Sequence, residues 1–235
     1  MVEITTVDSK ITEDKYFFDP FVIKVEMNGS GEVWKPTPHG HALARGMTKV
    51  PHIFCGKTVI EIGAGTGIHA VLAMKLGAKS IDITDINETV IATAKKNAQN
   101  NNVEFRQAWV KDWMNFEPSE LYDVVLCNPP FCKAGTPNRR WFITELIEQS
   151  PKFLKSGGHI IFSQSSMANF ISTEKELNAN NFMSEVVYKT RGLFRDYYFT
   201  EPNFIEESRQ VLNGFEIIDD EFIETLQVYL GTLRN

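Results

Sequence analysis

Two short motifs contain residue types that can hold a ligand and carry out chemistry on it. The first, with the sequence EIGAGTG at residues 61–67, ends an apolar run, and its glycines allow a tight turn in which the backbone approaches a ligand without obstruction by Cβ atoms. Its Gly-x-Gly-x-Gly spacing differs from the Gly-x-Gly-x-x-Gly of dinucleotide-binding proteins, and Glu61 suits a cationic ligand better than a pyrophosphate. The motif predicts a nucleotide or nucleoside site; the alternative is a glycine-rich turn that binds no ligand.

The second motif, Asn128-Pro129-Pro130-Phe131, begins 61 residues after Gly67 and follows another apolar run. Two consecutive prolines have fixed φ angles and no amide hydrogens, which leaves carbonyl oxygens free to accept hydrogen bonds, and the Asn128 side chain adds another acceptor. Such acceptors can hold both hydrogens of an amino group and aim the nitrogen lone pair at an electrophilic carbon, without a strong general base. Phe131 offers a flat face for stacking. These four residues are the catalytic candidates; the alternative is a Pro-Pro turn that leaves a sheet.

Two acidic residues are expected at strand ends beside these motifs. Asp85 lies 18 residues after Gly67, where a carboxylate can accept hydrogen bonds from both hydroxyls of a ribose; alternatively, it caps the following helix. Asp112 can accept a hydrogen bond from the adenine amino group, and Trp113 forms either an apolar wall beside the adenine or part of the core. The candidate cofactor-binding residues are Glu61, Gly63, Ala64, Gly65, Gly67, Asp85, Ile86, Asp112, Trp113 and Asn128.

Together, the motifs predict transfer of a methyl group from S-adenosylmethionine to a planar nitrogen. The glycine turn and Asp85 would hold the nucleoside, and Glu61 would face the methionine ammonium group directly or through water. Asn128 would present the acceptor nitrogen to the sulfonium methyl group.

The elements that must position these residues follow an alternating pattern. Short apolar runs predict strands near 58–62, 80–84, 103–108, 122–127 and 158–164, and helical periodicity separates them at 67–76, 87–99 and 139–154. Such alternation is typical of a doubly wound α/β fold with a mostly parallel sheet covered on both faces. A further helix is expected near 168–180, and two more strands near 183–190 and 221–233.

The chain divides into an N-terminal extension at 1–55 and a domain at 56–235. In the extension, the alternating stretch 21–27, the NGSG sequence at 28–31 and residues 32–34 predict a β-hairpin, followed by a helix from 39 to about 50. The segment 192–220 is rich in aromatic residues and is expected to form a lid or a partner surface; alternatively, its aromatics pack a small appended helix.

Composition limits the possible functions. The 235 residues, of which 43% are hydrophobic, can bury one substantial core. The apolar runs are too short to span a bilayer and no secretory signal is visible, which favours the cytoplasm. A net charge of -6 argues against a large phosphate-binding surface. The oligomeric state is not indicated.

Other residues with reactive side chains lack suitable partners in the sequence. Cys55, Cys127 and Cys132 have no metal-ligand spacing and fit free thiols in a reducing compartment, and Cys132 has no His or Asp partner for nucleophilic catalysis. The spacing of the histidines matches no common metal site, so no metal is expected. Arg139 and Arg140 are expected either to lie on the solvated start of a helix or to bind an anion near the site. The histidines whose spacing matches no common metal site are His39, His41 and His52.

Residues 21–162 resemble the class I S-adenosylmethionine-dependent methyltransferases that modify amino groups, and most closely the HemK-like protein-(glutamine-N5) methyltransferases. The resemblance lies in VWKPTP at 33–38, EIGAGTG at 61–67, TDIN at 84–87, KDW at 111–113 and the segment 123–131. It implies a seven-stranded sheet completed by a terminal antiparallel strand. It also implies that Glu61, Gly63, Gly65 and Asp85 hold the cofactor, that Asp112 and Trp113 border adenine, and that Asn128 and Pro129 hold the acceptor nitrogen.

The chain departs from that family at three points. Phe131 replaces the usual tyrosine, as it does in enzymes that resemble ribosomal-RNA guanine-N2 methyltransferases, and PTPHGH at 36–41 replaces the family's PRPETE. The helical N-terminal substrate domain is also missing. We therefore expect an N-methyltransferase that acts on an amide or amino nitrogen of a protein or small molecule. The alternatives are an enzyme that methylates an amino group of an RNA or DNA base and a non-catalytic scaffold that binds S-adenosylmethionine.

Overall fold

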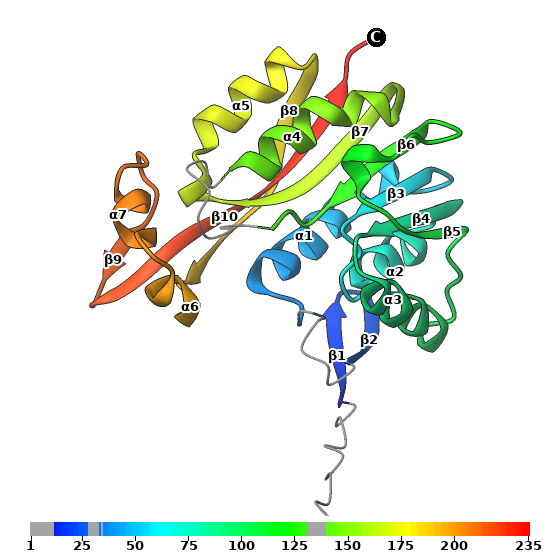
Figure 1. Cartoon of the computed structure of the whole chain (residues 1–235), viewed down its shortest axis with the longest axis horizontal. Helices are drawn as coiled ribbons and strands as arrows, with labels where there is room; N and C mark the ends of the chain where they lie inside the picture. Colours follow the sequence, from blue (N-terminus) through cyan, green and yellow to red (C-terminus); the bar gives the residue numbers. More distant parts are fainter. Residues whose placement is uncertain (1–11, 28–32, 34, 131–139) are drawn as a thin grey trace, which may run out of the picture.

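The computed structural model describes residues 12–27, 33, 35–130 and 140–235, which form two β-sheets and the helices that cover the larger one (Figure 1). The smaller sheet is a hairpin of β1 (Thr12–Phe18) and β2 (Phe21–Met27). The larger sheet has the order β5-β4-β3-β6-β7-β10-β8, with β9 paired to β10. Its strands are β3 (Thr58–Ile62), β4 (Ser80–Asp85), β5 (Gln107–Val110), β6 (Tyr122–Cys127), β7 (Leu154–Ser165), β8 (Phe182–Leu193), β9 (Glu216–Ile218) and β10 (Glu221–Leu233).

The larger sheet confirms the doubly wound prediction. Strands β3 to β7 pair in parallel, whereas β10 is antiparallel to both β7 and β8. The three-residue β9 joins the sheet only through β10. The strand predicted at 103–108 begins later in the structure, where β5 starts at Gln107. Val103 and Phe105 have the spacing of a strand, but they pack against the core from the connection that precedes it.

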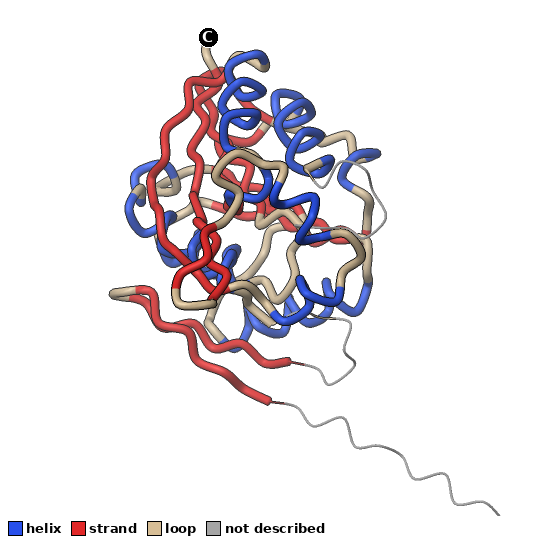
Figure 2. Tube along the Cα trace, turned by 90° about the vertical axis from the view of Figure 1, so that its left-hand side faces the viewer, coloured by secondary structure: helices blue, strands red, loops and turns tan. Residues whose placement is uncertain are grey.

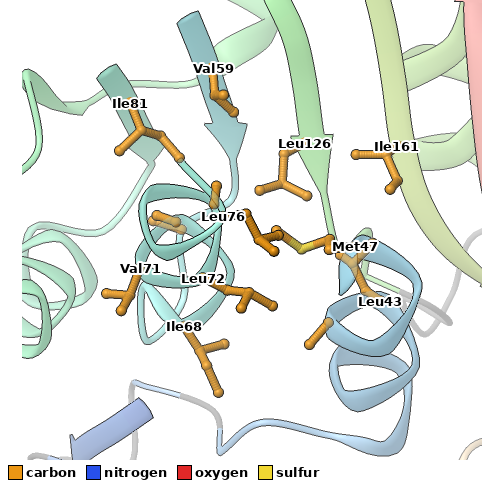
Figure 3. Packing of buried hydrophobic residues seen from close by; sticks show 14 of the residues in the cluster. Leu43, Met47, Val59, Ile68, Val71, Leu72, Leu76, Ile81, Leu126 and Ile161 are labelled. Atoms are coloured by element: carbon orange, nitrogen blue, oxygen red, sulfur yellow. The ribbon is translucent and has the colours of Figure 1, made fainter. Parts of the chain in front are cut away.

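The helices cover the two faces of the sheet separately (Figures 1 and 2). On one face, α1, α2 and α3 pack against side chains such as Val59 and Leu126; on the other, α4 and α5 pack against the alternate positions, such as Ile60 and Val125. Figure 3 shows Met47 of α1 and Leu72 of α2 pointing into the space between these two helices. The helices are α1 (Pro38–Lys49), α2 (Ile68–Lys75), α3 (Glu88–Asn100), α4 (Trp141–Gln149), α5 (Phe170–Ala179), α6 (Asp196–Thr200) and α7 (Phe204–Arg209).

The N-terminal hairpin exists, and it is formed by β1 and β2. Strand β2 pairs with the preceding β1, with Phe18 opposite Phe21, so the chain reverses at Asp19-Pro20. The predicted turn at 28–31 lies outside the described residues. An Asp-Pro pair between two extended segments is also a turn signal, and it sets the pairing here. Asn97 of α3 and Asn101, which caps the C-terminus of α3, bind the backbone of β2. Asn97 accepts from Glu26 N at 2.7 Å and Asn101 from Lys24 N at 2.9 Å.

Among the described residues there are also four short 3₁₀-helices: η1 (Pro51–Ile53), η2 (Trp113–Asn115), η3 (Ser150–Lys152) and η4 (Ser166–Ala168). In the part of the chain that the structure describes, no helix combines the length and the hydropathy needed to cross a membrane.

Candidate active site

The glycine motif forms an open turn between β3 and α2. Gly63, Gly65 and Gly67 have φ angles of +73°, +52° and +76°, a region that side chains disfavour. The amides of Gly63 and Ala64 donate to Thr84 O at 2.9 and 3.0 Å, which fixes the turn against β4. A Cβ atom at position 63 or 65 would meet no atom within 4 Å, so the backbone there borders open space. This cradle fits a ligand that approaches the backbone closely.

Gly67 has a different role in the turn. A Cβ atom there would lie 3.0 Å from the Ala94 Cβ atom and 3.2 Å from its backbone, so this glycine allows α2 to approach α3. The third glycine of nucleotide-binding turns commonly has such a packing role.

Asp85 ends β4 beside this turn. Its Oδ2 atom accepts a hydrogen bond from Gly65 N at 3.4 Å and its Oδ1 atom accepts one from Asn87 N at 3.1 Å. The N-cap of α3 is Asn87, whose side chain accepts from Thr89 N at 2.8 Å. Asn87, and not Asp85, is therefore the residue that caps α3. Burial raises the pKa of Asp85. The next residue, Ile86, has a side chain that is 73% exposed.

Glu61 is fully buried beneath the turn. Its Oε1 atom lies 3.2 Å from His69 Nδ1, and its Oε2 atom accepts a hydrogen bond from Ala70 N at 3.1 Å. His69 Nε2 lies 2.9 Å from Gly40 O and must donate to it, because a carbonyl oxygen only accepts. Burial raises the pKa of Glu61. His69 is not among the candidates named from the sequence, where its only signal is a polar residue at a helical position two residues after the glycine motif.

Asp112 and Trp113 occupy different environments. Asp112 is exposed and caps η2, where its side chain accepts from Met114 N at 3.1 Å. The Trp113 ring is buried, with centroids 5.6 Å from Phe142 and 6.3 Å from Phe153. This placement agrees with the core alternative for Trp113.

Asn128 follows the last residue of β6 and is anchored to β7. Its Oδ1 atom accepts a hydrogen bond of 2.7 Å from Ser163 Oγ. Its Nδ2 atom lies 3.5 Å from the position of a Cβ atom at Gly40, so the first turn of α1 approaches this amide closely. Pro129 is buried and Pro130 is exposed. Phe131, Cys132 and Arg139 lie outside the described residues.

The sheet register brings the two motifs together. Ile62 lies opposite Thr84 on β4 and opposite Cys127 on β6. The residues that follow, Gly63, Asp85 and Asn128, therefore leave the sheet at the same level and the same edge. This edge, formed by the carboxyl ends of parallel strands, is where doubly wound sheets bind ligands.

The remaining candidates from the sequence lie in different surroundings and do not form one cluster. His39 Nε2 lies 3.3 and 3.2 Å from the two carboxylate oxygens of Glu224, His41 contacts the Tyr16 and Phe18 rings, and His52 lies in η1. Arg140 bonds to Ala168 O, Asn169 O, Thr173 and Glu176. Within the described ranges, no three His, Cys, Asp or Glu side chains are arranged to hold a metal ion.

Known proteins resemble this chain in sequence. Residues 41–195 match the methyltransferase small domain family. A Methanocaldococcus jannaschii protein named "Putative protein N5-glutamine methyltransferase" is 28% identical over 187 residues, covering 70% of this chain and 88% of the relative. A ribosomal protein L11 methyltransferase of Lactobacillus johnsonii is 35% identical over 130 residues, covering 54% of this chain. The match spans only 37% of that longer relative.

Solved structures share the fold. A 16S rRNA N2 methyltransferase from T. thermophilus, in complex with AdoMet and guanosine, superposes with a TM-score of 0.63 at 15% identity, covering 99% of this chain and 53% of the other. The open glycine cradle with Asp85 at its edge fits the cofactor of such enzymes. The chain belongs to the methyltransferase small domain family and is an S-adenosylmethionine-dependent methyltransferase.

Proposed function

We propose that this protein methylates an amide or amino nitrogen of a protein acceptor. The observation that carries the proposal is the position of Asn128, which leaves the sheet beside the glycine turn and has its Oδ1 atom fixed by Ser163. A carbonyl-type oxygen accepts two hydrogen bonds, so Oδ1 can still accept one from an acceptor N–H. Holding the nitrogen in this way restricts it to an orientation suited to direct displacement.

The cofactor-binding residues form the other half of the proposed site. S-adenosylmethionine, when bound, supplies an electrophilic methyl group on its sulfonium. The backbone of Gly63, Ala64 and Gly65 would face the cofactor, and Asp85 would accept from the ribose hydroxyls. Exposed Ile86 and Asp112 would border adenine. Because Glu61 is fully buried and bound to His69 and Ala70, it would support the turn from beneath, with any link to the methionine ammonium running through water.

The choice of a protein acceptor rests on two observations. The Methanocaldococcus jannaschii relative, which this chain matches over most of its length, is named for methylation of glutamine in protein. The net charge of -6 is unfavourable for a phosphate-rich acceptor. The free thiols of Cys55 and Cys127 are compatible with a reducing compartment such as the cytoplasm.

A nucleic-acid base is the second candidate acceptor. The structural neighbour in complex with guanosine methylates rRNA at N2, an exocyclic amino nitrogen, and phenylalanine at position 131 suits a stacked base. The same acceptor oxygens at Asn128 would serve either nitrogen.

The domain division is also part of the proposal. Residues 1–55 would form an extension, residues 56–235 the methyltransferase domain, and residues 192–220 an insertion that serves as a lid or a partner surface. The helices α6 and α7 and strand β9 lie in that insertion.

A labelling experiment tests the proposal. The protein is incubated with radiolabelled S-adenosylmethionine and fractionated lysate, and nuclease-treated and protease-treated halves are counted separately. Label that survives nuclease but not protease supports the protein acceptor. The reverse pattern supports a nucleic-acid acceptor, and label in the small-molecule fraction supports a metabolite. Absence of label in every fraction, with S-adenosylhomocysteine still bound, would support the non-catalytic scaffold.

A further inference from the structure

Two buried His–Glu pairs hold the first turn of α1. On one side, His69 binds Glu61 through Nδ1 and the carbonyl oxygen of Gly40 through Nε2, at 3.2 and 2.9 Å. On the other, His39 Nε2 lies 3.2 Å from Glu224 Oε2. Both histidines are 5% exposed and both glutamates are fully buried. Two consecutive residues of α1 are thereby joined to α2 and to β10.

This turn of α1 forms one side of the space around Asn128. A Cβ atom at Gly40 would lie 3.5 Å from Asn128 Nδ2 and 3.4 Å from His69 Nε2. Thr37 is the N-cap of the helix, and its Oγ1 atom accepts from Gly40 N at 3.4 Å. Movement of this turn would therefore change the room available to a group held by Asn128.

Further hydrogen bonds connect Glu224 to the insertion at 192–220. Arg195 donates to Tyr198 Oη from Nε at 3.1 Å and from a terminal nitrogen at 2.9 Å. Tyr198 therefore uses its own hydrogen to donate to Glu224 Oε1, at 3.5 Å. The Tyr198 ring is fully buried and stacks on Phe204 at 4.5 Å. A continuous polar chain thus runs from α6 through β10 to α1.

We propose that Glu224 is a positioning residue that holds the first turn of α1 beside Asn128, through His39, and couples this turn to the insertion. The inference rests on the proposed function, because it assigns the wall of the same acceptor site. Glu61 and His69 hold Gly40 of the same turn independently of Glu224, and Glu61 lies beneath the glycine turn. Loss of Glu224 should therefore affect the acceptor and leave the affinity for the cofactor unchanged.

The variant Glu224→Gln keeps the size of the side chain and removes its charge. Asp82→Asn is the matched control: Asp82, which lies in β4 away from α1, is also fully buried, and it accepts hydrogen bonds from Arg106 and Tyr122. Both variants lose a buried, hydrogen-bonded carboxylate, so both should lower the melting temperature. An effect on the acceptor site should appear only in the variant Glu224→Gln.

Hydrogen exchange tests the position of α1 without reference to activity. The amides of residues 40–44 should exchange about tenfold faster in Glu224→Gln and at the parent rate in Asp82→Asn, because local opening of this turn becomes easier. Calorimetry with S-adenosylhomocysteine should give a Kd within about twofold of the parent for both variants. Equal exchange of these amides in the two variants would overturn the proposal.

Kinetics test the effect on the acceptor. With nuclease-treated lysate protein as the methyl acceptor, Glu224→Gln should raise the apparent KM about tenfold and leave kcat within about twofold, whereas Asp82→Asn should leave KM unchanged. The double variant His39→Gln/Glu224→Gln should recover most of the loss, because two amides can bond to each other. An unchanged KM in Glu224→Gln would overturn the proposal. If the parent labels no protein, the proposed function fails, and the exchange experiment still decides the role of Glu224.

Discussion

Ser163 Oγ donates a hydrogen bond of 2.7 Å to Asn128 Oδ1 and so joins β7 to the residue that directly follows β6. The bond fixes the amide plane of Asn128 and directs the remaining lone pair of Oδ1. Asn128 is only partly buried, so without this bond its side chain would adopt other rotamers.

Replacement of Ser163 by alanine should therefore reduce turnover about tenfold to a hundredfold, because the acceptor nitrogen loses its orientation. The affinity for S-adenosylhomocysteine should stay at the parent value. Ser156→Ala provides the control, since Ser156 lies at the opposite end of the same strand and bonds to Asn235. A parent rate in Ser163→Ala would show that the Asn128 orientation does not depend on this bond.

Gly63 borders open space and is proposed to face the cofactor, whereas Gly67 packs against Ala94 of α3. Their φ angles of +73° and +76° are nearly equal, so alanine at either position should cost a similar backbone strain of about 1–2 kcal/mol. Only Gly67→Ala adds a contact with Ala94, at 3.0 Å, and it should be the less stable variant. Gly63→Ala should lose affinity for S-adenosylhomocysteine beyond its loss of stability. Denaturant unfolding and calorimetry on the pair measure both effects; equal stabilities would contradict the packing role of Gly67.

The sequence predicted the sheet and the site edge because both follow from local signals. Apolar runs and glycine or proline turns placed the buried strands β3 and β6 at their observed bounds, and residues that follow parallel strands must meet at one edge. The turn at 19–20 was not predicted, because turn signals flank β2 on both sides, at 19–20 and 28–31, and local sequence does not rank them.

The sequence could not reveal contacts between distant segments. His69 and Gly40 are 29 residues apart, and His39 and Glu224 are 185 apart. No local pattern marks a histidine that binds a buried glutamate through the tertiary fold. Trp113 shows the same limit, because its spacing near a strand end suits both a ligand wall and the core in which it lies.

Binding of the cofactor should depend on the ionisation of Asp85. Burial raises the pKa of this carboxyl above its ordinary value of 3.8. Since the ionised form accepts hydrogen bonds at both oxygens, affinity for S-adenosylhomocysteine should fall as the pH drops through the raised pKa. Asp85→Asn should bind about tenfold to a hundredfold more weakly at neutral pH and lack this pH dependence. Calorimetry across pH checks both statements, and parent affinity in the variant would rule out the ribose contact.

Asp123 should contribute stability that is lost only in strong acid. Burial opposes ionisation of this carboxyl, but hydrogen bonds from Thr58 and Lys155 outweigh it and lower its pKa to about 2. A depressed folded-state pKa gives stability that is complete above the unfolded value near 3.8 and is lost as the pH falls toward about 2.

The variant Asp123→Asn should therefore be less stable at neutral pH by about 1 kcal/mol, a modest value because the pair with Lys155 is partly exposed. The difference from the parent should shrink as the pH approaches 2. Denaturant unfolding of both proteins from neutral pH to the lowest pH at which both fold measures it. A difference independent of pH would mean that the loss is one of packing.

Ile86 is expected to affect the affinity for the cofactor, and Trp113 is expected to affect the stability of the fold. The exposed Ile86 side chain contributes little burial, so Ile86→Ala should change stability by less than about 0.5 kcal/mol. Its position beside Asp85 should nonetheless make the variant bind S-adenosylhomocysteine about threefold to tenfold more weakly, through lost contact with adenine. Trp113→Leu should lose about 2–4 kcal/mol of stability, because the ring packs between Phe142 and Phe153, and keep its affinity. Weakened binding by a stable Trp113→Leu protein would return Trp113 to the adenine wall.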